Sequence, residues 1–493
     1  MSDAVLRNAL FPLFLVCSLA MQAGGTEIYV PDDYPAIQGA IDAAQSGDTV
    51  IVRPGTYAEW IDFLGKAITV KSSHGPLVTT IRHSSPYNAR AVVKFGSGED
   101  RNSVLDGFTI TGGRGGEYWY HMSQGGGIFC VSSPTIVNNI IRDNGDAEVG
   151  WWPEIGGGIF VWGDPLIAGN VITGNLAGSG GGIYVEGGEP NIRNNVIAGN
   201  RATSYDGGGA KLSGSLTFTG NVLTENTAAG YGGGLMLYTT SSWVGANNTI
   251  VRNRAGTAGG GIYYGYPYQT SIANSVVRDN TAPVSPDVHS NGILDAYHCN
   301  IEGGWSRGSG NIDADPLFVD PVHGDFHLRF DSPCRNAGTS GVPGLPTQDF
   351  EGDPRIAGGE VDIGADEFYP HLYYRRGFLA APGYAADREI DVRIVGPPGT
   401  PGVTLGTSWQ ILEPPLQTPF GDLHLQPPLL MALPLGPIPA GGVLSLTATY
   451  PDSWVEGDRI YFQALLSGSG SNALLTNLMT LTVARPPWSP LWH

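Results

Sequence analysis

The sequence predicts an all-β fold, a right-handed parallel β-helix that grows as a solenoid, because one glycine-led unit recurs six times in its middle. Each unit opens with Gly-Gly-Gly, and successive triplets start 31, 24, 27, 25 and 27 residues apart. A second signature follows each triplet and ends in Asn, five residues after an Asn or Ser. A period in the mid-twenties, with short β-rich runs, indicates stacked coils of two or three strands. The triplets begin at Gly125, Gly156, Gly180, Gly207, Gly232 and Gly259.

The chain begins with the pattern of a signal peptide. Arg7 precedes the apolar stretch 9–20, and small residues follow it, so we expect cleavage of residues 1–23 and a secreted or cell-surface protein. The apolar stretch of about 12 residues is too short to cross a bilayer, and no later segment is long enough. A lipoprotein would use Cys17, but Val16 stands where the lipobox has Gly or Ala.

A short helix is expected over residues 35–45, where Ile37 and Ile41 share one face and Pro35 stands in the first turn. We expect this helix to cap the open end of the solenoid, because unpaired strand edges invite aggregation. Strands that extend the solenoid in less regular coils are expected at 49–53, 68–71, 79–83, 91–95 and 105–111.

The repeated asparagines predict an inner ladder. Equivalent residues of stacked coils lie about 4.8 Å apart, so recurring side-chain amides can bond along the axis. The triplet glycines are expected to have positive φ or to let neighbouring coils approach closely. The paired ladder positions are Asn139 and Asn144, Asn170 and Asn175, Asn195 and Asn200, Asn221 and Asn226, Asn248 and Asn253, and Ser275 and Asn280.

Strand alternation after each triplet sorts the side chains into two faces. One parity is apolar and is expected to form the core, Cys130 included. Of the mature cysteines, Cys299 and Cys334 are the pair for which export would permit a disulfide. The opposite parity is expected to face solvent and carries Phe129, Phe160, Tyr184, Lys211, Met236 and Tyr263.

The composition shifts near Pro370 to a proline-rich, β-patterned stretch. We therefore expect the β-helix to span residues 26–370 and a C-terminal β-sandwich-like domain to span residues 371–485. Residues 486–493 form a tail without a recognisable sorting signal.

Three passages carry a family resemblance: YVPDDYPAIQGAIDAAQSGDTVIVRPGTY, the GGGI and NNxIxxN repeat, and DSPC followed by VDIGADEF. Together they resemble exported bacterial right-handed β-helix proteins of the pectate-lyase-like superfamily, over about residues 26–370. The motifs of polygalacturonases and pectin methylesterases do not occur here. The superfamily includes lyases, hydrolases, esterases, epimerases and noncatalytic surface proteins, so the resemblance implies a fold more than an activity.

Two functions therefore stay open. One is an extracellular protein that binds a polysaccharide, with degradation as a candidate activity, in which case it would be a lyase of uronic-acid polymers. The other is a noncatalytic surface or adhesion protein that uses the solenoid as a spacer or binding scaffold. The formal net charge of −19 and the lack of any basic run argue against nucleic acid as a partner. The sequence leaves the oligomeric state open.

The candidate catalytic residues are Lys211, Glu186 and Asp206. A polysaccharide lyase needs a base, commonly Lys or Arg, and a cation that neutralises the uronate. Lys211 interrupts an aromatic stripe, and the two acids lie close to it in repeat position. The alternative is a solvated surface lysine.

Aromatic residues in and before the outward strands are the candidate substrate-binding residues, because exposed rings in register can stack on sugars. Packing of loops against the solenoid is the equally weighted alternative. These residues are Trp151, Trp152, Phe160, Tyr184, Tyr205, Tyr231, Tyr238 and Tyr263.

An acidic cluster with interspersed glycines is a candidate for structural calcium, although its spacing is not that of an EF-hand and the paired-aspartate motif of pectate lyases is absent. Turn-forming aspartates are the alternative. The cluster comprises Asp349, Glu351, Asp353, Asp362, Asp366 and Glu367.

Overall fold

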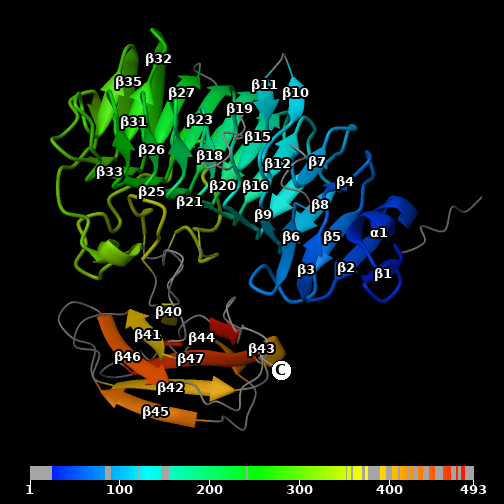
Figure 1. Ribbon diagram of the computed structural model, residues 1–493. Helices are drawn as coiled ribbons and strands as arrows, with labels where there is room; N and C mark the ends of the chain where they lie inside the picture. Colours follow the sequence, from blue (N-terminus) through cyan, green and yellow to red (C-terminus); the bar gives the residue numbers. More distant parts are fainter. Residues whose placement is uncertain are drawn as a thin grey trace, which may run out of the picture.

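The computed structural model confirms the right-handed parallel β-helix (Figure 1). It describes residues 25–83, 90–119, 122–145, 155–239, 243–350, 352–356 and 359–368, together with the strands between residues 372 and 482. Each regular coil contributes one strand to each of three long parallel sheets, which we call sheets C, A and B in the order that the chain visits them. Four central coils add a strand to a short sheet D. No helix in the described residues is long and apolar enough to cross a membrane.

Sheet A runs the whole length of the solenoid. It contains β1 (Glu27–Val30), β2 (Thr49–Val52), β5 (Thr69–Ser72), β8 (Val104–Asp106), β13 (Thr135–Val137), β16 (Leu166–Ala168), β20 (Asn191–Arg193), β24 (Thr217–Thr219), β28 (Val244–Ala246), β32 (Gln269–Ala273), β35 (Ile293–Tyr297) and β37 (Gly308–Ser309).

Sheet B follows sheet A in each coil. It contains β3 (Gly55–Ala58), β6 (Thr79–Arg82), β9 (Thr109–Thr111), β14 (Ile140–Arg142), β17 (Val171–Thr173), β21 (Val196–Ala198), β25 (Val222–Thr224), β29 (Thr249–Val251), β33 (Val276–Arg278) and β36 (Asn300–Ile301). The stretch 105–111, expected as one strand, is divided between sheets A and B, because Gly107 turns the chain at φ +82°.

Sheet C carries the strands that follow the glycine triplets. It contains β4 (Ile61–Asp62), β7 (Val93–Phe95), β12 (Ile128–Cys130), β15 (Ile159–Trp162), β19 (Ile183–Gly187), β23 (Ala210–Gly214), β27 (Leu235–Thr239), β31 (Ile262–Tyr264) and β34 (Val288–Ser290). Sheet D contains β18 (Leu176–Ala177), β22 (Arg201–Ala202), β26 (Thr227–Ala228) and β30 (Arg254–Ala255), and β10 (Glu117–Trp119) forms a hairpin with β11 (Met122–Gln124).

The expected N-terminal helix is present as α1 (Ile37–Ala43), two residues shorter at each end than the sequence indicated. Ile37, Ala40 and Ile41 are buried and belong to the same core cluster as the first coils. The Glu59 carboxylate accepts the N–H groups of Ile37 and Gln38, each at 2.9 Å, so a side chain from the following coil satisfies the start of the helix.

The asparagine ladder is confirmed. The Asn200 Nδ2 donates to the Asn226 Oδ1 at 3.0 Å and to the Ile172 carbonyl at 2.8 Å, while the Asn200 Oδ1 accepts from Asn175. One ladder runs from Asn139 to Ser275, and the other runs from Asn144 to Asn280. The second ladder ends on Asp287, whose Oδ1 accepts both the backbone N–H and the Nδ2 of Asn280.

The glycine triplets meet both expected requirements. The first glycine of each triplet has positive φ, for example +63° at Gly180. A Cβ on Gly158 would lie 2.5 Å from the Gly182 carbonyl oxygen of the next coil. The corner therefore excludes side chains because adjacent coils stack there backbone on backbone.

The disulfide that export would permit between Cys299 and Cys334 is not formed in the structure, where both cysteines are free. Cys299 belongs to the core cluster inside the solenoid, whereas Cys334 belongs to a cluster formed by later residues. Asn300 donates to the Cys334 sulfur at 3.2 Å. Cys130 is a buried core residue, as expected.

The residues after the last coil form a clasp, by which we mean the described residues of 313–368. The clasp contains β38 (Phe318–Asp320), the 3-10 turn η1 (Pro321–His323) and β39 (Asp325–Leu328). Its apolar side chains bury the outward valines of sheet B, among them Val251 and Val276. The passage DSPC to VDIGADEF therefore covers one flank of the solenoid.

The strands after residue 372 pair only in antiparallel fashion where the structure describes them, which agrees with the expected change to a sandwich-like architecture. They are β40 (Leu372–Arg375), β41 (Glu389–Val395), β42 (Gly402–Ser408), β43 (Ile411–Thr418), β44 (Gly421–Leu425), β45 (Met431–Gly436), β46 (Val443–Thr449), β47 (Arg459–Ser467), β48 (Leu474–Leu475) and β49 (Met479–Thr482).

We expect Asn200→Ala to lower the free energy of unfolding by at least about 2 kcal/mol, because it leaves several buried donors and acceptors without partners at roughly 1–3 kcal/mol each. Urea unfolding followed by circular dichroism measures the change. Arg201→Ala is the control, because this neighbouring side chain is exposed. Equal midpoints for the two variants would show that the ladder contributes little.

The end of the second ladder should make stability depend on pH. Burial raises the pKa of Asp287 to about 6, so the folded protein disfavours its ionisation. We expect stability to fall as pH rises from about 4 to about 7, because the unfolded chain then ionises this group more readily.

Asp287→Asn should reduce this loss of stability, since an amide oxygen accepts the same two bonds without charge. Unfolding curves of both proteins across this pH range test the idea, and parallel pH profiles would contradict it.

Candidate functional site

The outward side chains of sheet C form a column, one residue per coil. Phe129 stacks on Phe160 with ring centroids 5.6 Å apart, and Phe160 stacks on Tyr184 at 6.1 Å. Lys211 follows in register with Tyr184, and Met236, Tyr263 and His289 continue the column. The column arises because strands of successive coils pair in parallel without a shift at this position.

Most of this column is buried, so the expectation that it faces solvent is wrong. Phe160 and Met236 are fully buried, and Phe129 and Tyr263 nearly so. The chain folds back over the column just before each glycine corner, where Ile155 packs against the phenylalanines. Ala258 likewise packs against Met236 and Tyr263. For these four side chains, packing of loops on the solenoid is the correct interpretation.

Lys211 lies where the column is incompletely covered. Its Nζ is 3.9 Å from the Asp206 carboxylate and 3.3 Å from the Ser179 hydroxyl. The same atom lies 5.3 Å from the centre of the Tyr184 ring and 5.7 Å from that of Tyr238. The lysine side chain is 17% exposed, so it is a held cation and not a solvated one.

Two opposing effects act on the Lys211 ammonium. Desolvation by burial lowers its pKa, while the charges of Asp206 and Glu186 act in the opposite direction. Burial raises the pKa of the Tyr184 phenol, and the neighbouring Glu186 adds to that rise. The Lys211 ammonium therefore gives up its proton more readily than an exposed lysine does. The Tyr184 phenol, in contrast, stays protonated.

A β-bulge helps to place Glu186. Trp162 pairs with Gly187, so β19 contains one more residue than β15 at this point. Bulges redirect a side chain at the cost of one regular pairing. Glu186 is exposed, which puts a carboxylate at the rim of the lysine cluster.

A second aromatic cluster lies two coils further along the same face. The Tyr231 and Tyr263 rings are 4.5 Å apart, and Tyr263 stacks on His289 at 4.9 Å. The Asn291 amide donates to the Tyr263 hydroxyl at 2.8 Å. Tyr231 is 36% exposed, so this cluster presents one open ring.

The structure thus brings together Lys211, Asp206, Glu186, Tyr184 and Tyr238. Ser179 and His289 were not predicted as site residues. Ser179 and Asp206 each stand directly before a glycine triplet, which is a signal for their register, whereas no triplet precedes His289. Tyr205 is 63% exposed in the loop before its glycine corner. Of the other candidate residues, Phe160 and Tyr263 are buried, Tyr231 is exposed, and Trp151 and Trp152 lie outside the described residues.

The acidic cluster organises the clasp through backbone hydrogen bonds. Asp349 accepts the N–H groups of Gly352 and Asp353, and Asp362 accepts those of Asn336 and Phe368. Turn formation, the alternative to calcium, therefore accounts for Asp349, whereas Asp362 joins two backbone segments that are separated in sequence.

Arg355 adds a buried cation to the same region. It is 1% exposed and donates to the Gly364 and Ala365 carbonyls. Burial lowers its pKa, and the charges of Asp349 and Glu367 oppose that effect. Among the described residues, no three His, Cys, Asp or Glu side chains are arranged to hold a metal ion, and Glu351 lies outside those residues.

Comparison with known proteins supports the fold. A family model described as a right-handed β-helix region matches residues 163–303, the coils that contain the lysine cluster. No curated protein matches the sequence.

Two solved structures are similar at 10% identity. One is the enzymatically active domain of tailspike protein 2 of bacteriophage CBA120, with a TM-score of 0.33 and coverage of 94% of this chain and 77% of that one. The other is full-length tailspike protein 2 of an Escherichia coli O157:H7 bacteriophage, with a TM-score of 0.35 and coverage of 94% and 69%. At these scores neither likeness carries an argument.

The burial of the column gives a direct prediction. Phe160→Ala should lower the free energy of unfolding by about 3–5 kcal/mol, because it opens a cavity between two stacked rings. Tyr205→Ala serves as the control and should change it by less than about 0.5 kcal/mol. Chemical denaturation measures both, and a mild effect at Phe160 would mean that the overlying loop closes the gap.

Proposed function

We propose that this protein binds an extracellular polysaccharide along the outer face of sheet C. One observation carries the proposal: Lys211, two carboxylates and two tyrosine rings form a single cluster on this face. The exposed rings of Tyr205 and Tyr231 belong to loops of the same face. A cation, acceptors and aromatic rings are the groups that orient polar ligands with apolar ring faces.

The solenoid adds a geometric reason for a polymeric ligand. Successive coils are spaced about 4.8 Å apart, and three of them contribute accessible groups to this face: first Glu186, then Tyr205 and Lys211, then Tyr231. A linear polysaccharide can follow such a row of groups over these coils. The net charge of −19 argues against a nucleic acid in the same place.

A lyase activity on uronic-acid polymers is the second candidate, favoured by the state of Lys211. Its burial lowers the ammonium pKa, which suits a group that takes the proton next to a uronate carboxylate. A ligand would first have to replace the contact between Lys211 and Asp206. Without that replacement the lysine orients the polymer, and the protein binds without turnover.

Affinity electrophoresis of the mature chain in gels containing pectate, alginate or neutral polysaccharides tests binding. We expect retardation by at least one polymer, with the apparent affinity about tenfold lower for Tyr231→Ala because an open ring is lost. Leu77→Ala is the control, since Leu77 is 41% exposed but lies between β5 and β6, outside both candidate binding sites. Retardation by no polymer, or equal loss in both variants, would contradict the proposal.

Turnover is tested separately by following the ultraviolet absorbance of unsaturated products, with and without calcium. A lyase in which Lys211 is the base should lose this signal in Lys211→Met while it still binds polymer through the tyrosines. Activity that survives this substitution would exclude Lys211 as the base. Binding without any product would support the noncatalytic function.

A further inference from the structure

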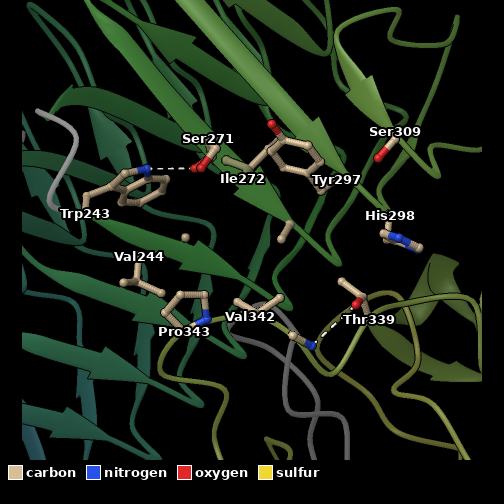
Figure 2. Close-up of a pocket in the computed structure, with 13 residues that line it drawn as sticks. Trp243, Val244, Ser271, Ile272, Tyr297, His298, Ser309, Thr339, Val342 and Pro343 are labelled. Atoms are coloured by element: carbon tan, nitrogen blue, oxygen red, sulfur yellow. Dashed lines mark hydrogen bonds between the residues drawn. The ribbon is translucent and has the colours of Figure 1, made fainter.

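A pocket of about 620 Å³ lies on the outer face of sheet A, away from the strands that carry Lys211 (Figure 2). Its floor consists of residues of β28, β32, β35 and β37, and residues 339–343 of the clasp form the opposite wall. Pockets of this size hold small ligands or a few sugar units. Nothing in the sheet C proposal accounts for this pocket.

The floor of the pocket is rigid and nearly flat. Gly245 cannot carry a side chain, because a Cβ there would overlap the ring of Trp243, which fills the core beneath it. The Trp243 indole N–H donates to the Ser271 carbonyl at 2.9 Å (Figure 2). Ala273 is a small residue on the outward side of β32, which helps to keep the space above the sheet open.

The clasp wall is also fixed in place. The Asn274 amide donates to the Thr339 carbonyl at 2.9 Å, and the Thr339 N–H donates back to the same side chain at 2.9 Å. The Thr339 hydroxyl accepts the Gly341 N–H at 3.4 Å (Figure 2). Asn274 has φ +46°, a conformation that asparagine tolerates better than most residues and that aims its side chain at the clasp. The pocket is therefore preformed.

The lining is uncharged but amphipathic. No Asp, Glu, Lys or Arg is among the residues that line the pocket, and its one imidazole ring, His298, bonds the Ala337 carbonyl. Tyr297 lies on the sheet side, with Val342 and Pro343 on the clasp side (Figure 2). Hydroxyl groups are supplied by Ser271, Ser309 and Thr339.

We propose that this pocket binds a neutral sugar ring, as a separate site from the sheet C face. The exposed Tyr297 ring offers a surface for the apolar face of a pyranose, and the surrounding hydroxyls match ring hydroxyls that both donate and accept. A uronate is disfavoured because its carboxylate would be desolvated without a cation beside it. The proposal stands whether or not the sheet C face binds a polymer.

Isothermal titration of the mature chain with neutral oligosaccharides tests this site. The probes are the tetrasaccharides of cellulose, xylan, mannan, galactan and amylose, with tetragalacturonate as the charged comparison. We expect at least one neutral probe to bind and to bind more tightly than tetragalacturonate. Tyr297→Ala and Ala273→Leu, which remove the ring and fill the floor, should each weaken that binding about tenfold or more. Tyr297→Phe keeps the ring and should retain most of it.

Tyr268→Ala is the matched control, because it removes a tyrosine that is 59% exposed and does not line the pocket, and it should leave this binding unchanged. Equal unfolding midpoints establish that the pocket variants are folded, and Tyr297→Leu, which removes the ring but keeps an apolar side chain, replaces Tyr297→Ala if that variant does not fold. The inference is overturned if no neutral probe binds, if tetragalacturonate binds more tightly in a manner that depends on Tyr297, or if binding of the neutral probe is unaffected by the changes at Tyr297 and Ala273. Loss in Tyr231→Ala with retention in Tyr297→Ala would assign the sugar to sheet C and also overturn it.

Discussion

The close stacking of coils at the glycine corners is the constraint on which the rest of the structure depends. At each corner the carbonyl of one coil occupies the space that a Cβ of the next would need, as between Gly158 and Gly182. This backbone contact fixes how each coil is aligned with the coil that stacks on it. The asparagine ladders then hold this register from inside, because a one-residue slip would reverse the two faces of every strand.

Fixed register turns local sequence into long columns of like side chains. On sheet C the column is aromatic over several coils, and its rings bury one another with help from the loops before each corner. Lys211 interrupts that column, so its side chain lies in the same apolar surroundings as the neighbouring rings. Its ammonium is consequently held by two rings and by Asp206, where an ordinary surface lysine would be hydrated.

The fold and the inner ladder could be predicted because both depend on periodicity, which a single sequence displays. The burial of Phe160 and Tyr263 could not, since strand alternation separates two faces but does not show what covers the outer one. The state of Cys299 and Cys334 could not be predicted either, because the sequence does not show that Cys299 packs in the solenoid core and Cys334 in the separate cluster of the clasp. The lysine cluster could be predicted because the repeat places Lys211, Glu186 and Asp206 at neighbouring positions. The pocket could not, because one of its walls belongs to the clasp, which is distant in sequence.

The two candidate sites differ in chemical character because different parts of the chain cover them. The sheet C cluster is bordered by loops of the repeat itself, and these loops contribute charged side chains such as Asp206. Its lysine is therefore already paired within the protein. A ligand there must compete with Asp206, which favours a polymer that brings its own acceptors at many positions. The sheet A pocket is closed by the clasp, which contributes hydroxyl and apolar groups but no charge. One solenoid can thus carry a charged cluster beside a buried aromatic column and, separately, a neutral pocket, because the register of the coils builds the first and the chain beyond the repeat builds the second.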